Sequence, residues 1–254
     1  MPICILTDNT AHLPREPFPG APLIQTIALR VEDRLLSAHS VDDFQRTFRG
    51  LEHEFDSILV LTISGHVLPV AEIARAAAIQ RGGKVCISVL DSMQTGGGLG
   101  ILAQIGAQIA AKGQPLTEVE KHIRAAIPNI YTLIHTEAGF LPGQAATDTP
   151  LPLPIFTLDE GQLSLYKNVR NRRNLLESFQ EFIEEFEHPQ QVNILCGSDT
   201  LLRSRALRAI SRDLFPDTPL GAGEMSAPLM ALFGAQSIEV AILEAPFDKL
   251  AKPL

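Results

Sequence analysis

The chain has 254 residues, of which 45% are hydrophobic and 20% charged, with 21 Lys and Arg against 29 Asp and Glu. This composition excludes disordered, collagen-like and coiled-coil proteins and indicates a globular protein with one large domain or two modest ones. The net charge of −8, the lack of a basic stripe and the absence of Trp predict that the protein does not bind nucleic acid.

The three cysteines, Cys4, Cys86 and Cys196, each lie in an apolar run and have no close partner in the sequence. Such cysteines are typical of buried thiols in a reducing compartment. The chain starts with a strand-like segment, PICILTD, and no apolar run approaches the ~20 residues of a membrane span. We therefore expect a soluble cytoplasmic protein without a membrane span.

The first half of the chain predicts a parallel sheet. Its apolar, β-branched runs are PICILTD, PLIQTIALRV, SILVLTIS, VCISVLD and YTLIHT, with helical patterns between them at 41–54, 67–80, 99–112 and 117–128. Strands that alternate with helices are typical of a parallel sheet with crossover helices. We therefore predict an N-terminal, Rossmann-like α/β domain.

A Pro-rich segment at 139–154 separates the two halves of the chain. Its four prolines are incompatible with a helix or a central strand. We place the domain boundary inside it, which predicts domains at 1–145 and 146–254.

The second half opens with a predicted β-hairpin, PIFTLDEGQLSLYKNV, which turns at Asp159-Glu160-Gly161. A helical pattern at 175–183, the strand VNILCGS, a helix at 201–214 and the strand SIEVAILEA follow. We therefore predict a C-terminal α/β domain with a mixed or antiparallel sheet.

Three polar loops follow predicted parallel strands, at residues 7–10 (TDNT), 62–65 (TISG) and 91–95 (DSMQT). Ligands bind open α/β sheets at the carboxyl ends of their strands. One such loop alone is usually a helix cap or an Asx-turn. Three of them at one sheet edge predict a binding site that includes Ser64, Gly65, Ser92 and Thr95.

The segment 98–103 (GLGILA) matches the G-x-G-x-x-A form of the dinucleotide fingerprint. However, the chain lacks both the acidic residue expected at the end of a second strand, about 20 residues on, and a P-loop lysine. A phosphate or carboxylate at the start of the following helix remains open. The seven histidines share no metal-ligand spacing, so we expect neither zinc nor a cofactor.

Several segments together resemble the DegV family of bacterial fatty-acid-binding proteins. ILTDNTAHLP resembles the family's V-T-D-S-T-A-D-L-P, and VLDSMQTGGGLG is similar to its V-D-S-x-x-x-S-x-G-x-G. LDEGQLSLYKNVRNRRNLLE resembles its D-G-x-I-x-x-x-x-K-V-R-x-x-K-K-A. The resemblance covers nearly the whole chain. It implies two α/β domains with one acyl chain in a tunnel between them, a carboxylate held by hydroxyls and a His, and delivery of the ligand to a separate kinase.

The chain departs from the family at the three positions that the resemblance assigns to the carboxylate. Leu36 replaces the Thr of T-S-Q-P-S, Leu68 replaces a Ser of S-S-x-L-S-G-T-Y, and Met225 replaces the His of T-H-x-G-P-G. An unpaired carboxylate in an apolar site costs several kcal/mol, so either the head group is held elsewhere or the ligand differs. The predicted ligand-binding positions are Leu36, Ser37, Ser64, Gly65, Leu68, Ser92, Thr95, Gly96, Gly97, Gly98, Arg170 and Met225.

These observations predict a lipid-binding protein, not itself an enzyme, that holds one long-chain fatty acid or related acyl ligand between its domains. A fatty-acid kinase is the candidate protein partner. Two alternatives remain open. One is an enzyme that uses the 96–100 loop to bind a small anionic or nucleotide substrate. The other is a scaffold that kept the fold and lost the ligand.

Overall fold

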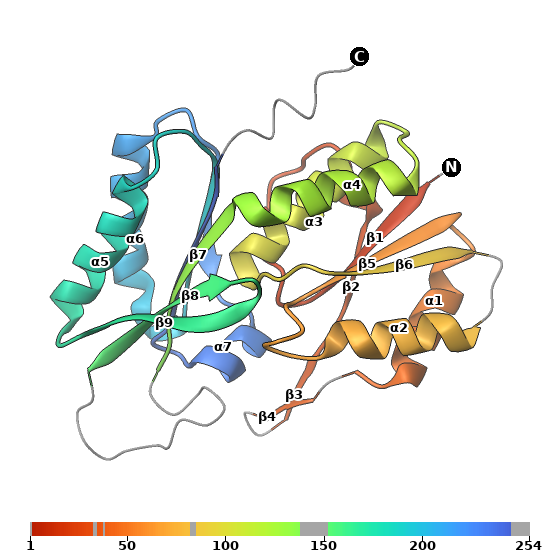
Figure 1. The fold of residues 1–254 in the computed structure, drawn as a ribbon, viewed down its shortest axis with the longest axis horizontal. Helices are drawn as coiled ribbons and strands as arrows, with labels where there is room; N and C mark the ends of the chain where they lie inside the picture. Colours follow the sequence, from red (N-terminus) through yellow and green to blue (C-terminus); the bar gives the residue numbers. More distant parts are fainter. Residues whose placement is uncertain (1, 33–34, 38, 82–84, 138–151, 245–254) are drawn as a thin grey trace.

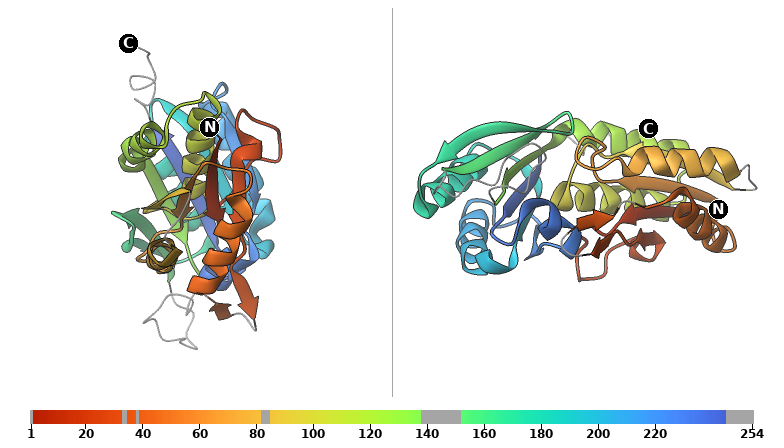
Figure 2. Two further views of the ribbon diagram at one scale, coloured as in Figure 1. Left: turned by 90° about the vertical axis from the view of Figure 1, so that its right-hand side faces the viewer. Right: turned by 90° about the horizontal axis from the view of Figure 1, so that it is seen from below.

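The computed structural model describes residues 2–32, 35–37, 39–81, 85–137 and 152–244 (Figure 1). Its strands form two large sheets that lie side by side along the length of the molecule (Figure 2). The chain completes the first sheet by Asp91 and begins the second at Ile130.

The first sheet has four parallel strands in the order β2-β1-β5-β6. They are β1 (Ile3–Asp8), β2 (Ile24–Ile27), β5 (Ser57–Thr62) and β6 (Cys86–Asp91). Two helices, α1 (Val41–Leu51) and α2 (Val70–Arg81), pack against each other on one side of this sheet, and α3 (Gly96–Ala111) and α4 (Leu116–Ala126) lie on the other (Figure 1). The predicted parallel sheet with crossover helices is thereby confirmed for these four strands.

The local sequence of α1 determines where this helix begins and which of its faces is buried. The hydroxyl of Ser40 accepts from the amide of Asp43 at 3.2 Å, and the Asp43 carboxylate accepts from the Ser40 amide at 2.9 Å, which forms a capping box. Phe44 and Phe48 follow at helical spacing, and both are fully buried. The cap fixes where the helix starts, and the two rings fix which face packs inward.

The second sheet has six strands in the order β11-β10-β12-β7-β8-β9. They are β7 (Ile130–His135), β8 (Leu153–Asp159), β9 (Gln162–Val169), β10 (Pro189–Cys196), β11 (Leu220–Glu224) and β12 (Ile238–Glu244). Only the β10–β11 pair is parallel, so the sheet is mixed, as predicted.

Two apolar cores cover the two faces of the second sheet. On its outer face, α5 (Arg172–Glu184) and α6 (Leu201–Leu214) enclose a core that includes Phe179 and Ile194. On its inner face, Leu195 and Ala241 join the core of the first sheet, together with Leu229 of α7 (Ala227–Phe233). The two sheets therefore share one continuous apolar core.

Helix α3 is the element that both sheets share. Fourteen of its sixteen residues are buried. It contacts β1 and β5 of the first sheet, and β7, β10 and β12 of the second. Its many Gly and Ala residues let the neighbouring strands approach its backbone closely.

A short hairpin of β3 (Arg30–Glu32) and β4 (Leu35–Ser37) lies beside α7. Short 3-10 turns occur at η1 (Ala21–Leu23), η2 (Ile127–Asn129) and η3 (Ser198–Thr200). The run PLIQTIALRV, expected as one strand, is divided between β2 and β3.

One predicted strand joins the other sheet. YTLIHT was expected to continue the parallel sheet, but β7 pairs antiparallel with β12 and β8 in the second sheet. The expectation was wrong because an apolar run shows that a strand is buried and does not reveal which strands pair with it. The domain boundary predicted between residues 145 and 146 lies outside the described residues.

Candidate functional site

Two of the three predicted polar loops, those after β5 and β6, meet the second sheet at its β8–β9 hairpin. The buried hydroxyl of Ser64 donates to the carbonyl of Gly161 at the hairpin tip, at 2.6 Å, and the Ser64 amide donates to the Gln94 carbonyl at 2.8 Å. One side chain thus connects the carboxyl edge of the first sheet to the second sheet.

Some of the hydroxyls and carboxylates hold the loops themselves, whereas the buried hydroxyls of Thr7, Thr62 and Thr95 form no hydrogen bond within the described residues. Ser92 accepts from the Gln94 amide at 3.0 Å, and the carboxylate of Asp91 accepts from the Gly65 amide at 3.0 Å. The fully buried carboxylate of Asp8 accepts from the amides of Thr10 at 3.0 Å and Ile63 at 2.8 Å. Burial raises the pKa of Asp8, and these hydrogen bonds oppose the rise. The loops lie at the predicted sheet edge, but Asp8, Asp91 and Ser92 already have partners.

The glycine-rich start of α3 is packed against the second sheet. The Gly97 amide donates to a carboxylate oxygen of Glu239, a β12 residue, at 2.5 Å, and the Gly97 carbonyl accepts from Asn193 at 2.9 Å. A Cβ on Gly96 would lie 2.8 Å from the side chains of Leu195 and Leu229. The start of α3, which the sequence left open as a binding site for a phosphate or a carboxylate, therefore binds the carboxylate of Glu239 from the same chain.

Glu239 is fully buried in this contact. Desolvation raises its pKa to about 7, although the Gly97 amide and the nearby Thr95 hydroxyl act to lower it. Sequence reasoning missed Glu239, because an acid in the alternating strand SIEVAILEA looks like a solvent-facing residue. Its partner across the strand pair, Leu195, is fully buried.

The apolar replacements at the expected carboxylate positions lie close to the shared core. Met225 is 2% exposed, and its sulfur accepts from the Ser237 hydroxyl at 2.9 Å. Leu68 is half-buried against the same apolar cluster. Leu36 and Ser37 belong to β4, which lies beside α7, and α7 begins two residues after Met225.

Arg170 lies away from the polar loops. It is exposed just beyond the far end of β9, whereas Gly161, which contacts Ser64, precedes the first residue of that strand. Eight residues of extended strand span roughly 25 Å. Arg170 and Ser64 therefore cannot contact the same head group.

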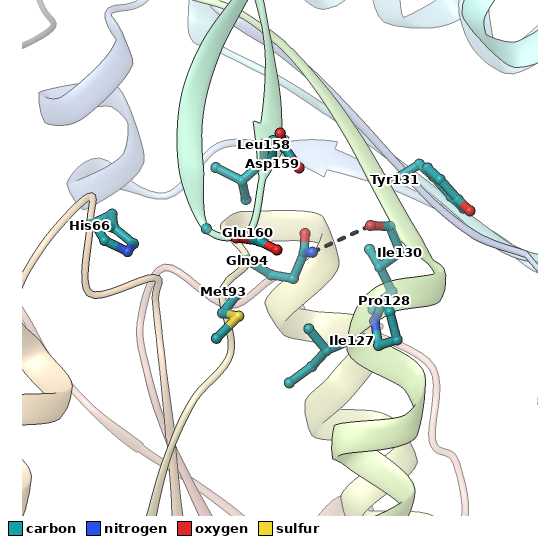
Figure 3. Close-up of a pocket in the computed structure, with 11 residues that line it drawn as sticks. His66, Met93, Gln94, Ile127, Pro128, Ile130, Tyr131, Leu158, Asp159 and Glu160 are labelled. Atoms are coloured by element: carbon teal, nitrogen blue, oxygen red, sulfur yellow. Dashed lines mark hydrogen bonds between the residues drawn. The ribbon is translucent and has the colours of Figure 1, made fainter.

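The structure also contains a pocket that sequence reasoning did not predict. It has a volume of about 670 Å³ and lies between the loops after β5 and β6, the start of β7 and the hairpin tip (Figure 3). Its lining residues are His66, Met93, Gln94, Ile127, Pro128, Ile130, Tyr131, Leu158, Asp159, Glu160 and Gly161. Sequence alone gives little sign of it, since its isoleucines resemble ordinary core residues.

A second hollow of about 550 Å³ lies between residues 11–16 and β11. It contains His12, whose pKa burial lowers. Across the described residues, no group of three His, Cys, Asp or Glu side chains is placed to bind a metal ion. No helix in the described part of the chain is long and apolar enough to cross a membrane.

Comparison with known proteins agrees with this architecture. The sequence model of the DegV family, described as a family of uncharacterised proteins, matches residues 26–138. No curated protein matches the sequence. A DegV family protein from Corynebacterium glutamicum has 20% sequence identity and a TM-score of 0.83, and the match covers 97% of this chain and 100% of that one.

Two further solved structures are similar over most of the chain. A Thermotoga maritima protein, whose structure is described as revealing a fatty acid binding function, has 18% identity and a TM-score of 0.79. The fatty acid kinase B3 protein of Streptococcus pneumoniae, loaded with linoleic acid, has 16% identity and a TM-score of 0.81. Each match covers 96% of this chain and 100% of the other. Together, the sequence match over residues 26–138 and the shared fold over nearly the whole chain confirm the resemblance to the DegV family.

Proposed function

We propose that the protein binds one long-chain acyl ligand between its two sheets and does not act as an enzyme. The observation that carries this proposal is the fold, which matches fatty-acid-binding DegV structures over 96–97% of the chain. The apolar core that both sheets share supplies the apolar surroundings that such a ligand needs. Burying about 14 methylenes at ~0.8 kcal/mol each gives roughly 11 kcal/mol before the costs of association.

The head group of this ligand is proposed to be uncharged, as in an ester or a protonated acid. Met225 and Leu68 offer no charge-assisted hydrogen bond. Ser64 and the Gly97 amide have partners within the chain, and Arg170 is remote from them. An ionised carboxylate buried here without a partner would lose several kcal/mol.

The protein is further proposed to be cytoplasmic and to present its ligand to a fatty-acid kinase. The similarity to a component of a bacterial fatty acid kinase supports that partner. Glu239 weakens the alternative of an anion-binding enzyme, because its carboxylate already accepts the hydrogen bond of the Gly97 amide that an anionic substrate would need.

Extraction of the purified protein tests the proposed function. The protein is denatured, extracted into organic solvent and analysed by mass spectrometry, and we expect one acyl lipid per chain. Thermal-shift measurements with palmitate and methyl palmitate then compare the head groups, and the ester is expected to give the larger shift. No extracted lipid and no shift with C14–C18 acids or esters would favour the scaffold alternative.

A further inference from the structure

The pocket in Figure 3, called here the hairpin pocket, adjoins the positions assigned to the acyl ligand and includes none of them. Its apolar walls come from Met93, Ile127, Pro128, Ile130 and Leu158, contributed by both halves of the chain (Figure 3). A pocket of about 670 Å³ is in the size range of small-molecule sites.

The backbone around the hairpin pocket is held by hydrogen bonds and by a tight turn. Among the described residues, only Met93 (φ 53°) and Glu160 (φ 46°) adopt positive φ without being glycine, and both line this pocket. The Met93 amide donates to Asp91 at 2.9 Å, and Ser64 holds the hairpin tip through Gly161. Glu160 adopts this conformation because Glu160 and Gly161 form the two-residue turn of the β8–β9 hairpin, which favours positive φ at both positions.

The pocket offers acceptors and negative charge to a ligand. The amide of Gln94 is already used, since its nitrogen donates to the Ile130 carbonyl at 3.4 Å and its oxygen accepts from Thr132 at 2.9 Å. The remaining charged groups are the exposed carboxylates of Asp159 and Glu160, and the lining contains no Lys or Arg. Neither carboxylate forms an ion pair within the described part of the chain.

Tyr131 also borders the pocket, but its ring packs against the ring of Phe186, with 5.3 Å between the two ring centroids. The groups that face a ligand are therefore the apolar wall and the two unpaired carboxylates, and together they fit one class of molecule. We propose that the hairpin pocket binds a small hydrophobic amine, with its apolar body against Ile127, Ile130 and Leu158 and its ammonium group at the hairpin carboxylates.

Three related probes of similar size test the pocket on the full-length protein by isothermal titration calorimetry at low ionic strength. They are 4-phenylbutylamine, 4-phenylbutanol and 4-phenylbutyrate, which share a phenyl ring on a short alkyl chain and carry a cationic, a neutral and an anionic head group. We expect the amine to bind about tenfold more tightly than the alcohol, because two partly exposed charge contacts contribute that much. The acid is expected not to bind. Equal affinities of the amine and the alcohol would overturn the proposal.

The double variant D159N/E160Q tests whether the preference for the amine over the alcohol arises at the hairpin pocket. It is expected to bind the alcohol as the native protein does and to lose the tenfold preference for the amine. The matched control E184Q/E185Q removes two exposed carboxylates from the end of α5 and the residue after it, and is expected to keep that preference. If D159N/E160Q keeps it as well, the amine binds elsewhere and the assignment to the hairpin pocket is wrong.

Discussion

Glu239 is a single buried residue that makes the stability of the contact between the two sheets depend on pH. Its carboxylate caps α3 from β12, and burial raises its pKa from 4.5 to about 7. A raised carboxyl pKa means that the folded state holds a proton that the unfolded state releases. The free energy of unfolding contributed by this group therefore falls as pH rises from about 4.5 to 7, by about 3 kcal/mol in total, and stays constant above that range.

The variant Glu239→Gln removes this pH dependence. The Gln oxygen can accept from Gly97 as the carboxylate does, without the cost of burying a charge. At pH 8 we expect Glu239→Gln to melt several degrees above the native protein, and at pH 4.5 to melt at nearly the same temperature. Calorimetry from pH 4.5 to 8 measures the difference, with the exposed Glu184→Gln as control. A difference that stays constant with pH would contradict this account of Glu239.

The apolar head-group positions give a second prediction for individual residues. The triple variant L36T/L68S/M225H restores the polar residues that the DegV resemblance implies. Each hydrogen bond to a charged oxygen contributes about 1.5–3 kcal/mol, and the Ser237 hydroxyl, 2.9 Å from the Met225 sulfur, is placed to orient an introduced imidazole.

We expect the triple variant to bind palmitate at least tenfold more tightly than the native protein, with a smaller gain for methyl palmitate. Fluorescence displacement of a bound lipid probe measures both affinities. Equal palmitate affinity of the two proteins would mean that the carboxylate is held away from these three positions.

Sequence reasoning located residues better than it assigned their roles. Ser64 and Ser92 lie at the predicted sheet edge because strand ends follow from the apolar pattern. The bond between Ser92 and Gln94 is a local turn, whereas the hydrogen bond from Ser64 to Gly161 depends on where the hairpin docks, which no local pattern encodes. The hairpin pocket was missed for the same reason, since four separate segments form it.

At the scale of elements, replacing a helical glycine with alanine is expected to change the stability of the protein in opposite directions at two positions. A Cβ at Gly100 in α3 would lie 1.9 Å from the backbone oxygen of His12, whereas a Cβ at Gly50 in α1 would meet nothing within 4 Å. We expect Gly100→Ala to destabilise the protein by about 1–3 kcal/mol through overpacking. Gly50→Ala is expected to stabilise it by up to about 1 kcal/mol, because Ala favours the helix.

Thermal melting of the two glycine variants measures the contrast. In a protein of this size, 1 kcal/mol corresponds to about 2–4 °C. Similar melting temperatures for Gly100→Ala and Gly50→Ala would show that α3 can move away from His12, against the close packing described above.

Sequence patterns predicted the helices better than the strand partners. The expected helices at 41–54, 67–80, 99–112 and 117–128 overlap α1, α2, α3 and α4. The pattern began α3 three residues late, because Gly96 to Gly98 resemble a loop until Leu195 and Asn193 are packed against them. Strand β7 was assigned to the wrong sheet because its partners come from much later in the chain.

At the scale of the whole molecule, β7 makes the two halves interdependent. It lies between β12 and β8 in the second sheet, although it precedes the predicted boundary at 145/146. A fragment of residues 146–254 therefore lacks a central strand, and we expect it to show no cooperative unfolding transition. Co-expression of 1–145 with 146–254 supplies β7 again and is expected to restore a folded complex. Cooperative melting of 146–254 alone would show that the second sheet tolerates the gap.

The place of β12 in the sheet has a consequence for the order of events during synthesis. β12 is made after β7 and β10, yet it lies between them. Until Ile238–Glu244 leaves the ribosome, β7-β8-β9 and β10-β11 are two half-sheets with open edges, and the start of α3 has no Glu239. Joining the half-sheets and capping α3 is thus a single late step, and a nascent chain stalled before it would carry the exposed strand edges that favour aggregation.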